Sequence, residues 1–301
     1  MFQDIDKVIY KQIIFLGLAI MFGLLLFGGG GLVLARAFWS EGDILAASSY
    51  ILDTPERLNF MRYLQFLTML GTFFFPAVAL AAVTPKPLSF LYLDRKIDGQ
   101  HIIMLMVMLI IVLPLVNALM IWNQGLHLPE SMAALEEWMR DKEAQLGSIT
   151  EKFVMTGSFT LLGVNLLVMA VLPALGEEFI FRGILMKWFS RSMNIHWAII
   201  LSAFIFSAIH MQFLGFFPRF FLGIVLGYVF YWSGSLWASV WLHFLNNAMT
   251  VIMYFLVARG LVDIEPETVG TIDSGLMLLV NTLIFFAAMY WFWAKRKEFR
   301  L

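Results

Sequence analysis

Long apolar segments separated by short polar ones dominate this chain. A bilayer core about 30 Å thick is crossed by roughly 20 mostly apolar residues in a helix. Eight segments meet this requirement: Ile13–Ala35, Tyr63–Val83, Ile102–Trp122, Phe153–Leu175, His196–Phe216, Phe217–Trp232, Leu236–Ala258 and Leu276–Trp293. The pattern therefore predicts an all-α, polytopic membrane protein with about eight transmembrane helices.

Two of the intervening segments have a helical pattern but carry too many charges to cross a bilayer alone. The first, Gly176 to Ser190, follows the fourth predicted span, and we expect it to lie at the membrane surface or to dip in from it. The second, Asn123 to Lys152, places Leu135 and Trp138 among charged residues. This spacing predicts a short amphipathic helix on the outer face of the membrane.

Composition supports a membrane location and excludes several other classes of protein. Of the 301 residues, 61% are hydrophobic and 14% are charged, whereas about a quarter of an average soluble domain is charged. A soluble globular enzyme is thereby excluded. The net charge of −1 provides no basic field for nucleic acid, and the lack of cysteine excludes disulfides, thiolate metal sites and a cysteine nucleophile.

The distribution of lysine and arginine predicts the orientation, because cytoplasmic loops carry an excess of both. Basic residues occur in the second loop, after the fourth span and in the tail: Lys86, Arg95, Lys96, Lys187, Arg191, Lys295, Arg296, Lys297 and Arg300. The first loop, with Arg57 and Arg62, fits this pattern least. We expect an integral protein of a bacterial cytoplasmic membrane with both termini cytoplasmic.

Polar residues within or beside the spans concentrate in the C-terminal half of the chain. They are Glu177, Glu178, Arg182, His210, His243, Asn246 and Asn247. Each charged side chain in a span costs roughly 3 kcal/mol on insertion scales, so such residues need partners or a purpose. Their concentration predicts a buried polar cavity.

Helical geometry divides these residues into roles. Glu178 and Arg182 are four residues apart and are placed to pair, whereas the adjacent Glu177 points elsewhere without a local cation. Glu177 either serves as a general base in an apolar setting or reaches interfacial water. Phe206 precedes His210 by one helical turn, and both Asn246 and Asn247 lie near the face of His243.

Two kinds of chemistry fit this set of residues. Glu177, His210 and His243 supply the ligand types of a site for zinc or another divalent metal, and we refer to these three as the candidate metal set. The same residues with Asn247 also supply a base together with imidazole and amide donors for an oxyanion. The chain lacks the His-Glu-x-x-His, Gly-x-Ser-x-Gly and phosphate-loop motifs.

Three short motifs give the sequence a family resemblance. Glu177-Glu178-Phe-Ile-Phe-Arg182, Phe206-Ser-Ala-Ile-His210 and His243-Phe-Leu-Asn-Asn247 follow in order on predicted helices. Together they resemble the signature of the CPBP (Abi) family, which comprises CAAX-prenyl endopeptidases and bacteriocin-processing or self-immunity proteins. The resemblance divides the chain into N-terminal helices (1–152), a catalytic core (153–258) and a last helix with a basic tail (259–301).

The resemblance implies an intramembrane protease in which Glu177 activates the attacking water. It implies that His210, His243 and Asn247 surround the same cavity and bind a metal or stabilise the oxyanion. Glu178 would be close enough to share the role of base, and Arg182 would support it. The family is described both as glutamate-type and as metal-dependent, and the absence of a compact zinc motif favours glutamate-activated water.

The expected substrate is a membrane-associated peptide or protein, prenylated or bacteriocin-like, because the cavity must be reached from the bilayer or its surface. An alternative function is non-catalytic: self-immunity to a peptide toxin or a scaffold for a protein partner. A transporter is a third hypothesis, since buried charges also mark ion paths. No inverted repeat or pair of broken helices supports that hypothesis.

Overall fold

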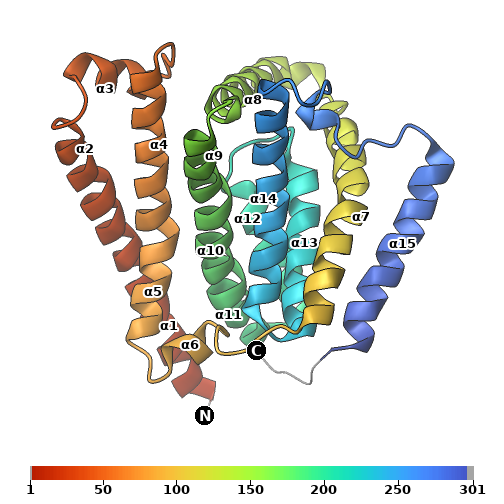
Figure 1. The fold of residues 1–301 in the computed structure, drawn as a ribbon. Coiled ribbons are helices and arrows are strands. Elements are labelled where there is room, and N and C mark those ends of the chain that lie inside the picture. Colours follow the sequence, from red (N-terminus) through yellow and green to blue (C-terminus); the bar gives the residue numbers. More distant parts are fainter. Residues whose placement is uncertain (1, 297–301) are drawn as a thin grey trace.

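The computed structural model describes residues 2–296, and the side chains of residues 8–296 other than Glu267. The tail residues Lys297 and Arg300 lie outside the described residues. Within the described range the secondary structure is helical throughout, which confirms the all-α prediction (Figure 1). The elements are α1 (Phe2–Gly23), η1 (Leu24–Gly29), α2 (Gly30–Ala35), α3 (Glu41–Ser48), α4 (Pro55–Met69), η2 (Leu70–Phe74), α5 (Phe75–Ala82), α6 (Pro87–Phe90), α7 (Gly99–Gln124), η3 (Glu130–Met132), α8 (Ala133–Val154), α9 (Phe159–Leu166), η4 (Leu167–Val171), α10 (Leu172–Glu178), η5 (Phe179–Leu185), α11 (Met186–Ser192), α12 (Ile195–Ala208), α13 (Phe216–Ser233), α14 (Leu236–Ala258), η6 (Pro266–Thr268) and α15 (Gly275–Ala294).

Seven helical stretches in the described part of the chain are long and apolar enough to cross a membrane. They are Val8–Ala35, Pro55–Ala82, Gly99–Gln124, Phe159–Ser192, Phe216–Ser233, Leu236–Ala258 and Gly275–Ala294. The predicted span His196–Phe216 is instead the 14-residue helix α12 followed by a loop. Such a helix is about 21 Å long, which is shorter than the bilayer core. The polytopic prediction is confirmed, with seven full-length candidates and one short helix.

The segment from Gly176 to Ser190 differs from the sequence-based expectation. It neither lies on the surface nor forms a separate dip, because it continues the fourth span in one helical stretch of 34 residues, Phe159–Ser192. Its charged residues Glu177, Glu178 and Arg182 are buried. Partners on other helices offset the free-energy cost of burying these charges. A scan of local hydropathy cannot detect such partners.

Arg62 also differs from its predicted place in a loop. It lies within α4 and is only 5% exposed. Its guanidinium donates to the Asn165 side chain (2.9 Å), to the Phe153 carbonyl (2.8 Å) and to the Asn59 side chain (2.8 Å). Arg62 is therefore a buried connector between α4, α8 and α9 and does not count as a loop charge.

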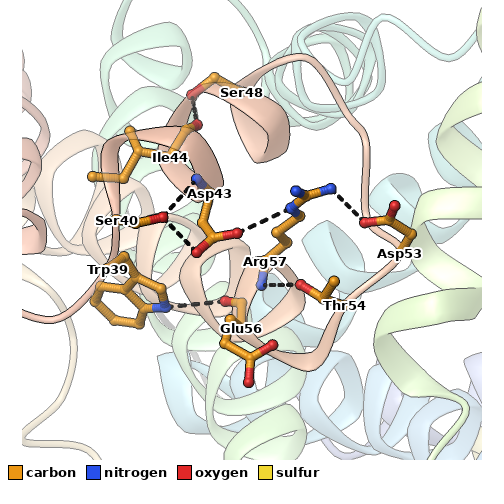
Figure 2. A network of polar contacts seen from close by, with 9 residues as sticks. All are labelled: Trp39, Ser40, Asp43, Ile44, Ser48, Asp53, Thr54, Glu56 and Arg57. Carbon is orange, nitrogen blue, oxygen red and sulfur yellow. Dashed lines mark hydrogen bonds and ion pairs between the residues drawn. The ribbon is translucent and has the colours of Figure 1, made fainter.

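The first two spans form an N-terminal hairpin at one edge of the bundle (Figure 1, left). A network at its tip joins the end of α2 and the start of α3 to α4 (Figure 2). Asp43 accepts a hydrogen bond from Ser40 Oγ (2.7 Å) and pairs with Arg57 Nε (3.2 Å). The indole of Trp39 donates to the Glu56 carbonyl (3.0 Å). These contacts fix the turn between the two spans.

Helix α8 confirms the predicted amphipathic helix between the third and fourth spans. It runs across the end of the bundle opposite α6 (Figure 1). Near its N-terminus, Glu136 accepts hydrogen bonds from the Leu128 amide (2.7 Å), His127 Nδ1 (2.8 Å) and Arg140 Nε (2.9 Å). These bonds, the Leu128 amide first, lower the pKa of the Glu136 carboxyl to about 2.

Candidate active site

Four charged or titratable side chains meet inside the helical bundle. We call Glu177, Glu178, Arg182 and His243 the buried polar cluster. The two glutamates end α10, the arginine follows in η5, and the histidine lies on α14. Their exposed fractions are 4%, 0%, 1% and 3%, respectively. Groups of this kind are tolerated at such depth only when they are paired.

Glu178 is the centre of the cluster. Its Oε1 accepts hydrogen bonds from Arg182 Nη1 (2.5 Å) and from the His243 ring at Nδ1 (2.9 Å). This contact confirms the predicted pairing of Glu178 with Arg182. Arg182 also donates to the Gly223 carbonyl (3.0 Å), and its guanidinium lies 4.8 Å from the centre of the Phe206 ring. The cation is therefore held between α13 and α12.

The contact with Glu178 fixes the tautomer of His243. A carboxylate paired with arginine is only an acceptor, so Nδ1 of His243 must carry the hydrogen. Nε2 of the neutral ring then presents a lone pair toward Glu177, whose Oε2 is 3.8 Å away. Two acceptors form no hydrogen bond with each other, and at this separation one water molecule can donate to both.

His210 lies in the turn after α12 and is half-buried. Its Nδ1 is 2.7 Å from the carbonyl oxygen of Phe206, which requires a hydrogen on Nδ1. The Phe206 ring stands edge-on to both imidazoles, with centroid distances of 5.2 Å to His210 and 5.8 Å to His243. Phe206 therefore orients His210 through its carbonyl, and its ring contacts both imidazoles. Neutral His210 presents Nε2 as an acceptor or ligand, and it could donate to an oxyanion only after protonation.

Asn246 and Asn247 are half-buried on α14, within one turn of His243. The side-chain amide of Asn246 donates to Oδ1 of Asn247 (3.3 Å). This contact assigns Oδ1 of Asn247 the acceptor role and directs its own NH₂ group elsewhere as a donor. Oδ1 of Asn247 thus accepts from its neighbour, and its NH₂ group is a hydrogen-bond donor.

The described residues contain no group of three or more His, Asp or Glu side chains arranged to hold a metal ion. The candidate metal set therefore has the ligand types that suit zinc, but its three members do not form a grouped ligand set in this arrangement.

One charged residue near the cluster is not among the candidates named from the sequence. Arg219, in the first turn of α13, is half-buried and donates to the side chain of Gln212 (2.8 Å). Its charge interacts electrostatically with Glu177 and His210. The signal was present, because Arg219 is a charged residue inside the predicted span Phe217–Trp232. Its proximity to the site depends on the turn between α12 and α13, which hydropathy does not predict.

Comparison with known proteins found a match in the part of the chain that carries this site. Residues 159–249, from the first residue of α9 to the middle of α14, match the family model described as "Type II CAAX prenyl endopeptidase Rce1-like". This range contains the buried polar cluster, Phe206, His210, Arg219 and both asparagines. No match to a curated protein or to a solved structure was found. The helical segment that carries the candidate site, residues 159–249, thus matches the model of the Rce1-like type II CAAX prenyl endopeptidase family, in agreement with the resemblance to the CPBP family.

Proposed function

We propose that this protein is an intramembrane endopeptidase that hydrolyses peptide bonds of membrane-associated substrates through a glutamate-activated water. The observation that carries the proposal is the arrangement of Glu177 Oε2 and His243 Nε2, two buried acceptors 3.8 Å apart. The family match to residues 159–249 supports the same class of reaction.

The reaction follows from these two acceptors. A water molecule that donates one hydrogen to Glu177 and the other to His243 Nε2 directs an oxygen lone pair toward the substrate. As this oxygen attacks the carbonyl carbon, Glu177 takes the first proton and the carbonyl oxygen becomes an oxyanion. The carbon–nitrogen bond then breaks, and the proton on Glu177 passes to the leaving amine. No proton is gained or lost over the cycle.

The surrounding residues orient and stabilise the reacting groups. Glu178, held by Arg182, keeps the hydrogen of His243 on Nδ1 and leaves Nε2 free to accept. The NH₂ group of Asn247 is our proposed donor to the oxyanion, and the cation of Arg219 adds long-range stabilisation of negative charge. Our proposed role for His210 is to accept a hydrogen bond from the substrate backbone, because its Nδ1 is occupied by the Phe206 carbonyl.

The proposed substrates are peptides or proteins attached to the membrane, whether prenylated or bacteriocin-like. Seven candidate spans support residence in a lipid bilayer. The first turn of α1 and the last turn of α15 lie at the same end of the bundle (Figure 1). The basic residues of the second loop, of the segment after the fourth span and of the tail predict the same orientation. Together with the position of the two helix ends, they support our proposal that both termini are cytoplasmic in a bacterial membrane.

The experiment compares purified wild-type protein with Glu177→Gln in lipid vesicles that contain a membrane-anchored peptide. Glu151→Gln, an exposed glutamate on α8, is the matched control. We expect Glu177→Gln to lower the cleavage rate by about 10²–10⁴-fold, the range for loss of a general base, and the control to cleave normally. The proposal fails if the Glu177→Gln protein cleaves at the wild-type rate. The non-catalytic alternative would be supported if the protein with both Glu177→Gln and His243→Gln still protected cells from a peptide toxin or still bound a protein partner.

A further inference from the structure

The loop between α12 and α13 carries His210 and has an unfavourable backbone conformation directly after it. We call residues 209–215 the His210 loop. The φ angle of Met211 is +54°, in the left-handed region that residues other than glycine rarely adopt. Such a conformation persists only when the surrounding structure holds it in place. The position of His210 therefore depends on the contacts that fix this loop.

Asn123, near the C-terminal end of α7, bonds to the loop from another part of the chain. Its side chain is buried, with 4% of its surface exposed. Its Nδ2 donates to the carbonyl of Phe213 (3.2 Å), inside the loop. Its Oδ1 accepts from the amide of Phe217 (3.0 Å), just after the loop. One buried side-chain amide thus holds both the loop and the start of α13.

The bond to Phe217 supplies a helix cap that the local sequence lacks. Phe217 is the second residue of α13, and the amides in the first turn of a helix have no partner within the helix. The side chain of the N-cap residue often accepts from one of them, but the N-cap here is Gly215. Asn123 provides the acceptor instead, so the start of α13 is fixed relative to α7.

Two aromatic contacts place the same loop against helices outside the family match. The ring centre of Phe213 lies 5.9 Å from that of Trp138 on α8. The ring centre of Phe217 lies 5.0 Å from that of Trp122, which precedes Asn123 on α7. These two tryptophans and Asn123 all precede residue 159, where the match to the family model begins. The N-terminal part of the chain therefore contributes to the surroundings of the candidate site.

We propose that Asn123 is a positioning residue of the candidate active site, because it fixes the loop from which His210 reaches the substrate. This inference rests on the proposed function, in which Nε2 of His210 accepts a hydrogen bond from the substrate backbone. Asn123 acts through the loop, since both of its bonds go to backbone groups of the loop and of α13. Losing an interaction that the substrate makes equally in the ground state and the transition state raises KM and leaves kcat unchanged.

The experiment compares full-length variants in the vesicle cleavage assay and by hydrogen exchange with mass spectrometry, the latter without substrate. Asn123→Ala removes both bonds to the loop and α13. Asn117→Ala is the matched control, because Asn117 lies on the same helix and donates to the Val269 carbonyl (2.7 Å), away from the candidate site. Asn123→Asp keeps the size of the side chain and the acceptor for the Phe217 amide, and it is the second variant if the alanine protein does not fold.

We expect Asn123→Ala to raise KM about tenfold with kcat close to that of the wild type, and to speed amide exchange in residues 209–217 about tenfold. Asn123→Asp should change both quantities in the same direction, and Asn117→Ala should change neither. His210→Ala should raise KM by a similar factor. The double variant with Asn123→Ala should raise KM no further, because the effect of Asn123 passes through His210.

Unchanged exchange or unchanged KM in Asn123→Ala would overturn the proposal, and the same results in Asn123→Asp would do so if the alanine protein does not fold. So would KM effects of Asn123→Ala and His210→Ala that multiply in the double variant. Equal changes in Asn117→Ala would indicate a general loss of packing and also contradict it. A wild-type protein that cleaves no membrane-anchored peptide would refute the proposed function, while exchange in residues 209–217 would still decide whether Asn123 fixes the loop.

Discussion

Replacement of Arg182 by methionine would test the electrostatic organisation of the buried polar cluster. The change removes the cation that donates to Glu178 Oε1 at 2.5 Å and leaves a carboxylate that is 0% exposed. Glu178 Oε2 already lacks a hydrogen-bond partner among the described residues. His243 Nδ1 would then be the one remaining donor to the carboxylate among the contacts described above. Removing one member of a buried ion pair costs about 3–5 kcal/mol, because the other charge stays buried.

This loss of stability converts to a measurable shift. For a chain of this size about 1 kcal/mol corresponds to roughly 2 °C, so we expect the thermal unfolding midpoint in detergent micelles to fall by roughly 6–10 °C. The double variant Arg182→Met with Glu178→Gln should recover more than half of this loss. Glutamine is neutral, and its side-chain oxygen still accepts from His243 Nδ1. A midpoint equal to that of the wild type in Arg182→Met would refute the reasoning, as would a double variant that is less stable than the single one.

Three further predictions concern helix packing, pH and metal. Gly23→Ala should lower the unfolding midpoint by roughly 2–6 °C, because its methyl group would overlap the Gly71 carbonyl, whereas Gly17→Ala has open space and should not. The pKa of Glu136 is lowered from 4.5 to about 2, so its stabilisation of the start of α8 is complete above about pH 4.5 and is lost as the pH falls toward 2. Proteolysis of the loop before α8 should increase over that interval in the wild type, and Glu136→Gln should remove this dependence; a flat wild-type profile contradicts the assignment. Purified protein should contain less than stoichiometric zinc, and stoichiometric metal that disappears when each member of the candidate metal set is replaced by alanine would establish a metalloprotease instead.

Much of the helical architecture could be predicted from the sequence because membrane insertion depends on local composition. A run such as Gly99–Gln124 is apolar over its whole length and needs no partner to be stable in lipid. The segment Gly176–Ser190 could not be predicted in this way. Its charges are acceptable inside the bundle because the Gly223 carbonyl and His243, both far along the chain, bond to them. Arg62 illustrates the same limit, since its partner Asn165 lies on another span.

The site was predictable to the extent that its contacts are local. Glu178 and Arg182 are one helical turn apart, so their pairing follows from the periodicity of a helix. The edge-on contact of Phe206 with His243 joins α12 to α14 and could not be deduced from spacing. The electrostatic contribution of Arg219 likewise depends on the turn after α12.

By itself the sequence determined that the chain is a helical membrane protein and that an acid, two histidines and an amide in its C-terminal half require explanation. Only the tertiary structure decided what each glutamate meets on other helices: Glu178 also contacts His243 Nδ1, while Glu177 faces Nε2 of the same ring across a gap of 3.8 Å. Adjacent positions in a helix differ by about 100° in direction, so the roles of neighbouring identical residues depend on which other helices pack against each side.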